Sequence, residues 1–260
     1  MTTIVLCTMK GGTGKTTTSV ALANGLHDQG KRVLLADMDP QMNAAFMSGV
    51  NIMEAPATLF DVFKGDSKTD EAILPLRLGF DLAMCGLQGT AADMTFTGLG
   101  RERILLEALE PVRKKYDYVI CDTSPSLSLL TTAAMTAADH MIIPLTADPL
   151  AVQGAMQLNA YTQNVRRYCN PNLNALGLLV TMYNGRSTLT KSMEDAIQAT
   201  AQQMGTTVFN TRIRRAQALQ DATATQEDIY TAAAKATATQ DYKAFVSEVL
   251  ERIEGNGGEK

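Results

Sequence analysis

The stretch "TMKGGTGKTT", residues 8–17, stands between a short apolar run, "TIVLC" at 3–7, and a segment of helical period. A glycine-rich turn that joins a strand to a helix is the setting of a phosphate-binding loop. The usual pattern, G-x-x-x-x-G-K-[ST], has glycine at its first position, where this chain has Met9. The next residue, Lys10, is a second cation for which an ordinary loop of this kind has no need.

The glycines of this loop predict a cradle for phosphate. Their backbone N–H groups can turn inward where the strand ends, and the dipole of the following helix adds positive potential. Lys15 would reach the β- and γ-phosphates as a point charge, and the Thr16 hydroxyl would ligate Mg²⁺. The residues expected to contact the nucleotide here are Gly11, Gly12, Thr13, Gly14, Lys15, Thr16 and Thr17.

Aspartates follow two further apolar runs. Asp122 closes "YVICD", where a phosphate-loop protein is expected to place the carboxylate that holds Mg²⁺. Asp37 and Asp39, in "ADMDPQ", follow an earlier run with a spacing that can aim both carboxylates toward one mouth. One of them would join the metal shell and the other would orient an attacking water.

Short apolar runs that alternate with helical segments predict the fold. Runs that are apolar on both faces are typical of a parallel sheet covered by helices on each side. The predicted strands are 3–7, 32–37, 80–85, 117–122, 140–145, 175–181 and 206–210. The predicted helices are 15–29, 101–115, 126–136, 149–167, 187–204 and 235–254. We expect a doubly wound α/β fold with a mostly parallel twisted sheet, helices on both faces and ligands at the carboxyl ends of its strands.

Length and charge set further limits. The 260 residues suit a single domain over 1–254, followed by a tail, 255–260, that is expected to be disordered. The Ala/Thr-rich piece 222–239 is expected to be a loop that leads into a helix. The net charge of -4 gives no global basic field, so a nucleic-acid partner would need a local patch.

The cysteines and the apolar runs indicate a cytoplasmic protein. The four cysteines form no C-x-x-C pair, and with two histidines they show no metal-ligand spacing, which is typical of a reduced compartment. We find no signal peptide and no apolar run near the roughly 18 to 20 residues of a membrane span.

Three motifs, "KGGTGKTT", "DMDPQ" and "CDTSPSL", resemble in order and spacing the ParA/MinD family of deviant Walker ATPases, with the best fit to its small, Soj-like partition ATPases. "IIPLTADPLAVQGAMQL" and "VTMYNGRSTLT" are similar to the family's later segments, so the resemblance covers nearly the whole chain. It implies that ATP and Mg²⁺ are the cofactors, and that Lys10 reaches across an ATP-bound homodimer to the other subunit's phosphates. Such a cation would neutralise charge on the transferred phosphoryl group only once the dimer has formed.

The same resemblance assigns roles to the acidic residues. Asp39 matches the residue that positions the hydrolytic water, which leaves Asp37 for the metal shell. The predicted metal ligands are therefore Thr16, Asp37 and Asp122, and the predicted catalytic residues are Lys10, Lys15 and Asp39.

The chain departs from the family's pattern at several positions. It has Ser124 where the family usually has Pro, and Met42 where the family usually has Gly. Near the expected adenine pocket, the family's "IPR" reads "IRR" at 213–215. Met182 and the segment 208–215 are the candidate base contacts.

Arginines gather in the C-terminal half and predict a DNA-binding patch of Arg186, Arg212, Arg214 and Arg215. From the residues alone, a solvated charged face is an equal alternative. The resemblance favours non-specific binding of double-stranded DNA on the nucleoid by the ATP-bound dimer. It also implies a ParB-like, centromere-bound partner that stimulates hydrolysis and releases the protein, which segregates a plasmid or chromosome.

Other functions fit some of the motifs. A ParA-like ATPase that positions another cargo, such as a protein cluster or microcompartment, would share all of them. A MinD-like membrane ATPase should end in a basic amphipathic helix, whereas "FVSEVLERIEGNGGEK" carries four glutamates. An iron–sulfur reductase would need cysteines on loops at a dimer axis, and Cys85 and Cys121 fall in or beside predicted strands. A tyrosine autokinase would need a tyrosine-rich tail, and this one offers only Tyr230 and Tyr242.

Overall fold

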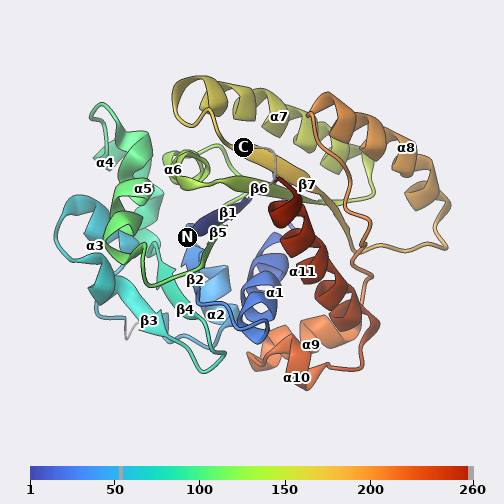
Figure 1. Ribbon diagram of the computed structural model, residues 1–260, viewed down its shortest axis with the longest axis horizontal. Coiled ribbons are helices and arrows are strands. Elements are labelled where there is room, and N and C mark those ends of the chain that lie inside the picture. Colours follow the sequence, from blue (N-terminus) through green and yellow to red (C-terminus); the bar gives the residue numbers. More distant parts are fainter. Residues whose placement is uncertain (53–54, 257–260) are drawn as a thin grey trace.

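The computed structural model describes residues 1–52 and 55–256. Across this part of the chain, strands form one sheet in the order β3-β4-β2-β5-β1-β6-β7 (Figure 1). Every pairing is parallel except that of β3, which runs antiparallel to β4 at the edge. The strands are β1 (Thr2–Leu6), β2 (Val33–Asp37), β3 (Ile73–Pro75), β4 (Asp81–Met84), β5 (Tyr118–Asp122), β6 (His140–Thr146) and β7 (Asn174–Thr181).

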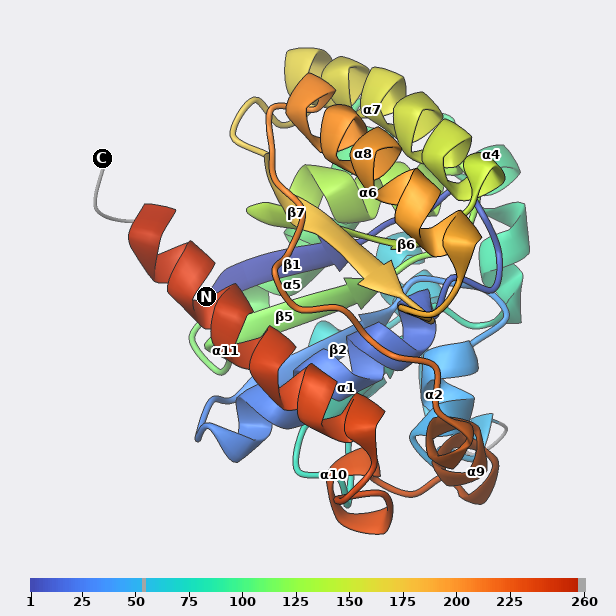
Figure 2. The same cartoon turned by 90° about the vertical axis from the view of Figure 1, so that its right-hand side faces the viewer.

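Helices cover both faces of the sheet, which confirms the predicted doubly wound fold (Figures 1 and 2). Ile4 and Leu6 of β1 pack with α1, α9 and α11, whereas Val5 packs on the other face with α5, α6 and α7. The helices are α1 (Lys15–Asp28), α2 (Asn43–Met47), α3 (Leu59–Lys64), α4 (Ala92–Thr95), α5 (Ile104–Leu109), α6 (Leu129–Ala137), α7 (Pro149–Tyr168), α8 (Thr188–Gln203), α9 (Gln217–Thr225), α10 (Ile229–Ala232) and α11 (Thr237–Asn256).

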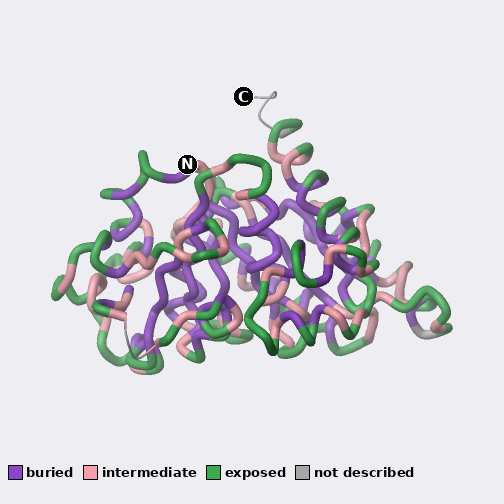
Figure 3. Tube along the Cα trace, turned by 90° about the horizontal axis from the view of Figure 1, so that it is seen from below, coloured by how far each residue is buried: buried purple, intermediate pink, exposed green. Residues whose placement is uncertain are grey.

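The register of the parallel strands brings their last residues together. Leu6 of β1 and Asp37 of β2 both lie beside Asp122 of β5. The strands themselves run through the buried middle of the molecule, and the loops that follow them reach its surface (Figure 3). Side chains in these loops therefore meet at the carboxyl ends of the strands, as expected for a parallel α/β fold.

Two predicted strand assignments need correction. The segment 206–210 is not a strand, because it meets β7 only through a bridge between Leu178 and Val208. Beyond that bridge the carboxylate of Glu248 accepts the backbone N–H groups of Asn210 and Thr211, which are thereby unavailable to a β-ladder. Conversely, the short edge strand β3 is absent from the predicted set, because three residues ending in proline carry no readable period.

The predicted helices omit the short α2, α3 and α4, and two other segments differ from their prediction. The expected helix 101–115 is α5 flanked by 3₁₀ turns, with Pro111 in the second of them. The piece 222–239, expected to be a loop, contains the end of α9 and all of α10. Helix α11 continues to Asn256, into the expected tail 255–260, and residues 257–260 of that tail lie outside the described residues. None of the helices in the described ranges is long and apolar enough to cross a membrane.

Candidate active site

The phosphate loop joins β1 to α1 as predicted. Gly12 and Gly14 have φ values of 74° and 76°, in the left-handed region that favours glycine. A Cβ added to Gly11 or Gly12 would meet no atom within 4 Å, so open space lies over the backbone here. The hydroxyl of Thr13 is buried and has no hydrogen-bond partner among the described residues. This geometry fits a phosphate group, which would occupy the space and accept hydrogen bonds from the backbone N–H groups of the loop and from the Thr13 hydroxyl.

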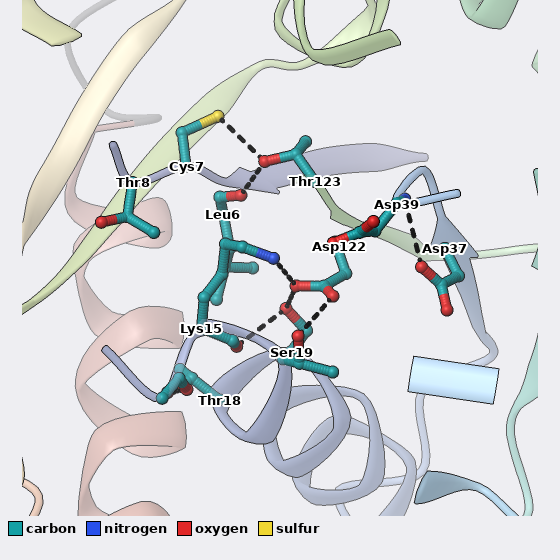
Figure 4. A network of polar contacts seen from close by, with 12 residues as sticks. Leu6, Cys7, Thr8, Lys15, Thr18, Ser19, Asp37, Asp39, Asp122 and Thr123 are labelled. Carbon is teal, nitrogen blue, oxygen red and sulfur yellow. Dashed lines mark hydrogen bonds and ion pairs between the residues drawn. The ribbon is translucent and has the colours of Figure 1, made fainter. Parts of the chain in front are cut away.

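Lys15 and Ser19 both contact Asp122 (Figure 4). Thr16 contacts it as well. The ammonium of Lys15 lies 2.8 Å from one carboxylate oxygen, and the hydroxyl of Thr16 donates to the other at 2.8 Å. Ser19, one turn into α1, donates to the same carboxylate at 2.7 Å. Asp122 has no exposed surface, so these donors compensate its burial.

The pair of Thr16 and Asp122 fits a Mg²⁺ site. Both offer the hard oxygen ligands that this ion prefers. Within 1–52 and 55–256, no three His, Cys, Asp or Glu side chains converge as a metal cluster. An ion held by these two residues would therefore depend on phosphate oxygens and water for the rest of its shell, which is the usual arrangement for nucleotide-bound Mg²⁺.

Asp37 is beside Asp122 but is engaged with its own loop. Its carboxylate accepts the backbone N–H of Asp39 at 3.2 Å and that of Ala45 in α2 at 3.0 Å. Burial, with the nearby charge of Asp122, raises the pKa of Asp37 to about 8. Its place in the metal shell stays a prediction.

Asp39 lines the cavity over the phosphate loop, and its role in orienting the attacking water stays a prediction. One of its oxygens accepts the N–H of Gln41 at 2.9 Å.

Met42 has a φ of 53°, which is a left-handed backbone conformation. This explains why the family pattern usually has glycine at this position. The Met42 side chain is buried in the core, which offsets the strain of that conformation.

Lys10 lies at the rim of the same cavity and is paired within its own chain. Its ammonium is 2.8 Å from a carboxylate oxygen of Asp148. Asp148 also accepts the N–H of Ala151, at the start of α7, and the hydroxyl of Thr146. Asp148 is not among the predicted site residues, since its only signal in the sequence is a helix-capping position before Pro149.

The cavity is large enough for a nucleotide, with a volume of about 710 Å³. All the predicted loop residues from Lys10 to Thr17 line it, as does Met182. Of the segment 208–215, predicted to contact the base, only Ile213, Arg214 and Arg215 line the cavity. The structure adds two walls that the sequence does not predict, from α2 and α9. Residues 222–225 of α9 fall in the piece expected to be a loop, so no helical face is expected there from the sequence.

The four arginines of the predicted DNA patch differ in their surroundings. Arg214 is paired with Asp241 at 2.6 Å, and Arg212 lies 3.8 Å from Glu194 and over the ring of Tyr183. Arg186 and Arg215 are exposed. Ile213 is buried between the flanking arginines, as the alternation of an extended segment predicts.

Known proteins resemble this chain over most of its length. The family AAA_31, described as "AAA domain", matches residues 1–175. The Caulobacter vibrioides protein "Chromosome partitioning protein ParA" is 33% identical, with 96% of this chain and 94% of that protein covered. "Chromosome-partitioning ATPase Soj" of Thermus thermophilus is 36% identical, with 96% of each covered.

Solved structures show the same fold. A Mycobacterium smegmatis protein titled cobyrinic acid a,c-diamide synthase, with bound ADP and magnesium, is 29% identical, with a TM-score of 0.85 and 98% and 97% of the two chains covered. The ATP complex of a substituted McdA from Cyanothece is 23% identical, with a TM-score of 0.85 and 96% of each chain covered, and shows a likeness of fold alone. The motifs, the sheet order and these relatives lead to one conclusion: the chain belongs to the ParA family and is a ParA-like positioning ATPase.

Proposed function

We propose that this ATPase is a partition switch. In its ATP state it forms a homodimer that binds double-stranded DNA without sequence preference, as a cytoplasmic, nucleoid-associated protein. A ParB-like centromere-binding protein stimulates hydrolysis and releases the dimer from DNA, which segregates a plasmid or chromosome. Its cofactors are ATP and Mg²⁺. The chromosome-partitioning proteins among its relatives support the proposal that its cargo is a plasmid or chromosome.

The position of Lys10 carries the proposal of a dimer. Lys15 already supplies the buried cation of the phosphate loop, whereas Lys10 sits at the rim with its side chain 37% exposed. A second cation at the rim can serve a site on another subunit. Exposed apolar side chains follow the carboxyl ends of three strands along the same edge, Leu87 after β4, Leu127 after β5 and Leu150 after β6. Such residues favour burial against a second copy of the chain.

The chain's own groups support hydrolysis in the following way. Bound Mg²⁺ would neutralise phosphate charge between Thr16 and Asp122. Lys15 exchanges its contact with Asp122 for the β- and γ-phosphates, and the backbone N–H groups of Gly11 to Gly14 hold the phosphates in place. Asp39 orients the attacking water from the cavity wall, and Lys10 of the second subunit stabilises the charge that develops.

The DNA-binding part of the proposal is supported by arginines on two segments, 182–187 and 210–216, which a bridge between Tyr183 and Arg214 holds together. Arg186 and Arg215 are exposed and can meet phosphates, while Arg212 and Arg214 would exchange their acidic partners for DNA. The chain is acidic overall, so binding depends on this local concentration and on its doubling in a dimer.

Binding to two unrelated duplexes across a salt series tests the switch. We expect equal affinity for both sequences with ATP, a steep fall of affinity with salt, and a large loss of affinity with ADP. Equal binding with ADP would contradict the switch. A ParA-like protein that positions a protein cluster remains the alternative. Because it would share all the motifs, the partner that stimulates hydrolysis distinguishes the two: stimulation by a centromere-binding protein supports partition, and its absence favours the other cargo.

A further inference from the structure

The nucleotide cavity continues past the phosphate loop into a space between two helices. On α2, Asn43, Phe46 and Met47 line it at positions i, i+3 and i+4, which is one helical face. On α9, Leu219, Gln220 and Thr223 line it from one helical face as well.

These two helices adjoin each other. Gly49 lies two residues after α2, and a Cβ added to it would lie 3.8 Å from the side chain of Gln226, the residue after α9. Helices α2 and α9 therefore lie side by side (Figure 2), and residues of both line the cavity that opens into the phosphate cradle.

Phe46 presents an aromatic ring to this space. It is 51% exposed although it borders a cavity, and its ring has no aromatic or cationic neighbour in the described ranges. An exposed phenyl ring forfeits the stabilisation that burial would give. A flat apolar ligand that covered it would recover that stabilisation.

Gln220 adds a polar group to the same space. Its side chain is exposed, and it projects from the face of α9 that lines the cavity. A carboxamide offers one donor group and one acceptor, the pair that adenine matches with its exocyclic amine and a ring nitrogen.

We propose that Phe46 stacks on the base of bound ATP and that Gln220 reads the edge of that base. The inference rests on the ATP site of the proposed function and adds base contacts on α2 and α9. A nucleotide whose phosphates lie in the cradle extends along the cavity, and its base is the flat, partly polar group that suits an aromatic ring beside a carboxamide. An aromatic side chain can stack on any base, whereas the hydrogen bonds of an amide distinguish one base from another.

Tryptophan fluorescence tests the stacking directly. The chain has no tryptophan, so Phe46→Trp creates a single reporter in the cavity. We expect saturable quenching by Mg-ATP and little change with Mg-tripolyphosphate, which can fill the phosphate cradle but has no base. Equal quenching by the two ligands would overturn the stacking role.

Affinity measurements separate the two residues. Phe46→Ala should weaken ATP and GTP alike, by about tenfold, and leave tripolyphosphate binding unchanged, which also shows that the variant is folded. Gln220→Ala should mainly reduce the preference for ATP over GTP. Tyr168→Ala, which removes another exposed aromatic ring at the end of α7, is the control and should change none of these affinities.

The outcomes distinguish this inference from the proposed function. Wild-type ATP affinity in Phe46→Ala would overturn the stacking role while the ATPase stands. A wild-type chain that binds neither ATP nor tripolyphosphate would overturn the ATP site itself, and the base contacts with it.

Discussion

The ammonium of Lys10 lies 2.8 Å from a carboxylate oxygen of Asp148, the residue that caps the start of α7 in the same chain. The charge of Lys10 is thus already paired within its own chain, before any other subunit is present. Engagement of another subunit's phosphates requires this ion pair to open. The contact is partly exposed, so its contribution is small, up to about 1 kcal/mol, and a triphosphate can outcompete it.

Replacement of Lys10 should separate nucleotide binding from assembly. Lys10→Ala is expected to retain most ATP binding but to lose the ATP-dependent dimer and partner-stimulated hydrolysis. Asp148→Asn is the matched variant, because it frees Lys10 and should leave dimers intact or more stable. Size-exclusion chromatography with a slowly hydrolysed ATP analogue checks both, and normal dimers with normal turnover in Lys10→Ala would rule out a role across the interface.

Removal of Lys15 should abolish nucleotide binding. Lys15→Ala takes away the point charge of the cradle and also leaves the buried carboxylate of Asp122 without its cation. The nucleotide-free protein should therefore lose on the order of 3 kcal/mol of stability as well. Calorimetric titration with ATP and chemical unfolding measure the two effects. An unchanged ATP affinity would mean that the loop is not the nucleotide site.

Asp39→Ala should block hydrolysis and spare binding. A carboxylate that orients water acts on the chemical step, so turnover is expected to fall roughly 10²- to 10⁴-fold while ATP and Mg²⁺ stay bound. The variant should accumulate as an ATP-bound dimer. If nucleotide binding is lost instead, Asp39 belongs to the metal shell, and Asp37 becomes the better candidate for the water.

The arginine patch is testable through salt dependence. Arg212→Ala combined with Arg214→Ala should weaken binding to all duplexes alike and flatten the slope of log K against log salt by roughly one unit per lost contact. Because Arg214 is held by Asp241 in the free chain, Asp241→Asn should strengthen DNA binding in the wild-type background. An unchanged slope in the double variant would reduce the patch to a solvated face.

The pKa of Asp37 predicts a pH dependence of stability. Its value of about 8 in the folded chain exceeds the value near 4 of an unfolded aspartate. Between these values the folded chain keeps a proton that the unfolded chain releases, so the stability of the nucleotide-free protein should fall as pH rises from about 4 to 8. Asp37→Asn should remove this contribution to the dependence of the free energy of unfolding on pH. Urea unfolding at several pH values measures it, and equal slopes in both proteins would contradict a raised pKa.

The central strands and the phosphate loop are predictable from the sequence because both depend on local patterns. The apolar runs at β2 and β5, each ending in an aspartate, are sufficient to predict Asp37 and Asp122 at the same end of the sheet. Only the strand register shows that the two residues lie side by side. Met42 shows the limit of such reading, since only the structure reveals that its left-handed backbone is offset by a buried side chain.

Contacts between distant segments are beyond local patterns. The carboxylate of Glu248 in α11 draws the chain at 210–211 away from β7, although the sequence of 206–210 has a strand-like composition. Asp148 likewise meets Lys10 across 138 positions. The wall made by α2 and α9 depends on how two short helices pack, which neither helix's own residues specify.

The contacts of Asp122 with Lys15, Thr16 and Ser19 have a consequence for turnover. Lys15, Thr16 and Ser19 share this one carboxylate as their partner within the chain, so nucleotide entry exchanges one set of polar contacts for another. Such an exchange has a small net free energy, which suits a ligand that must leave after each round.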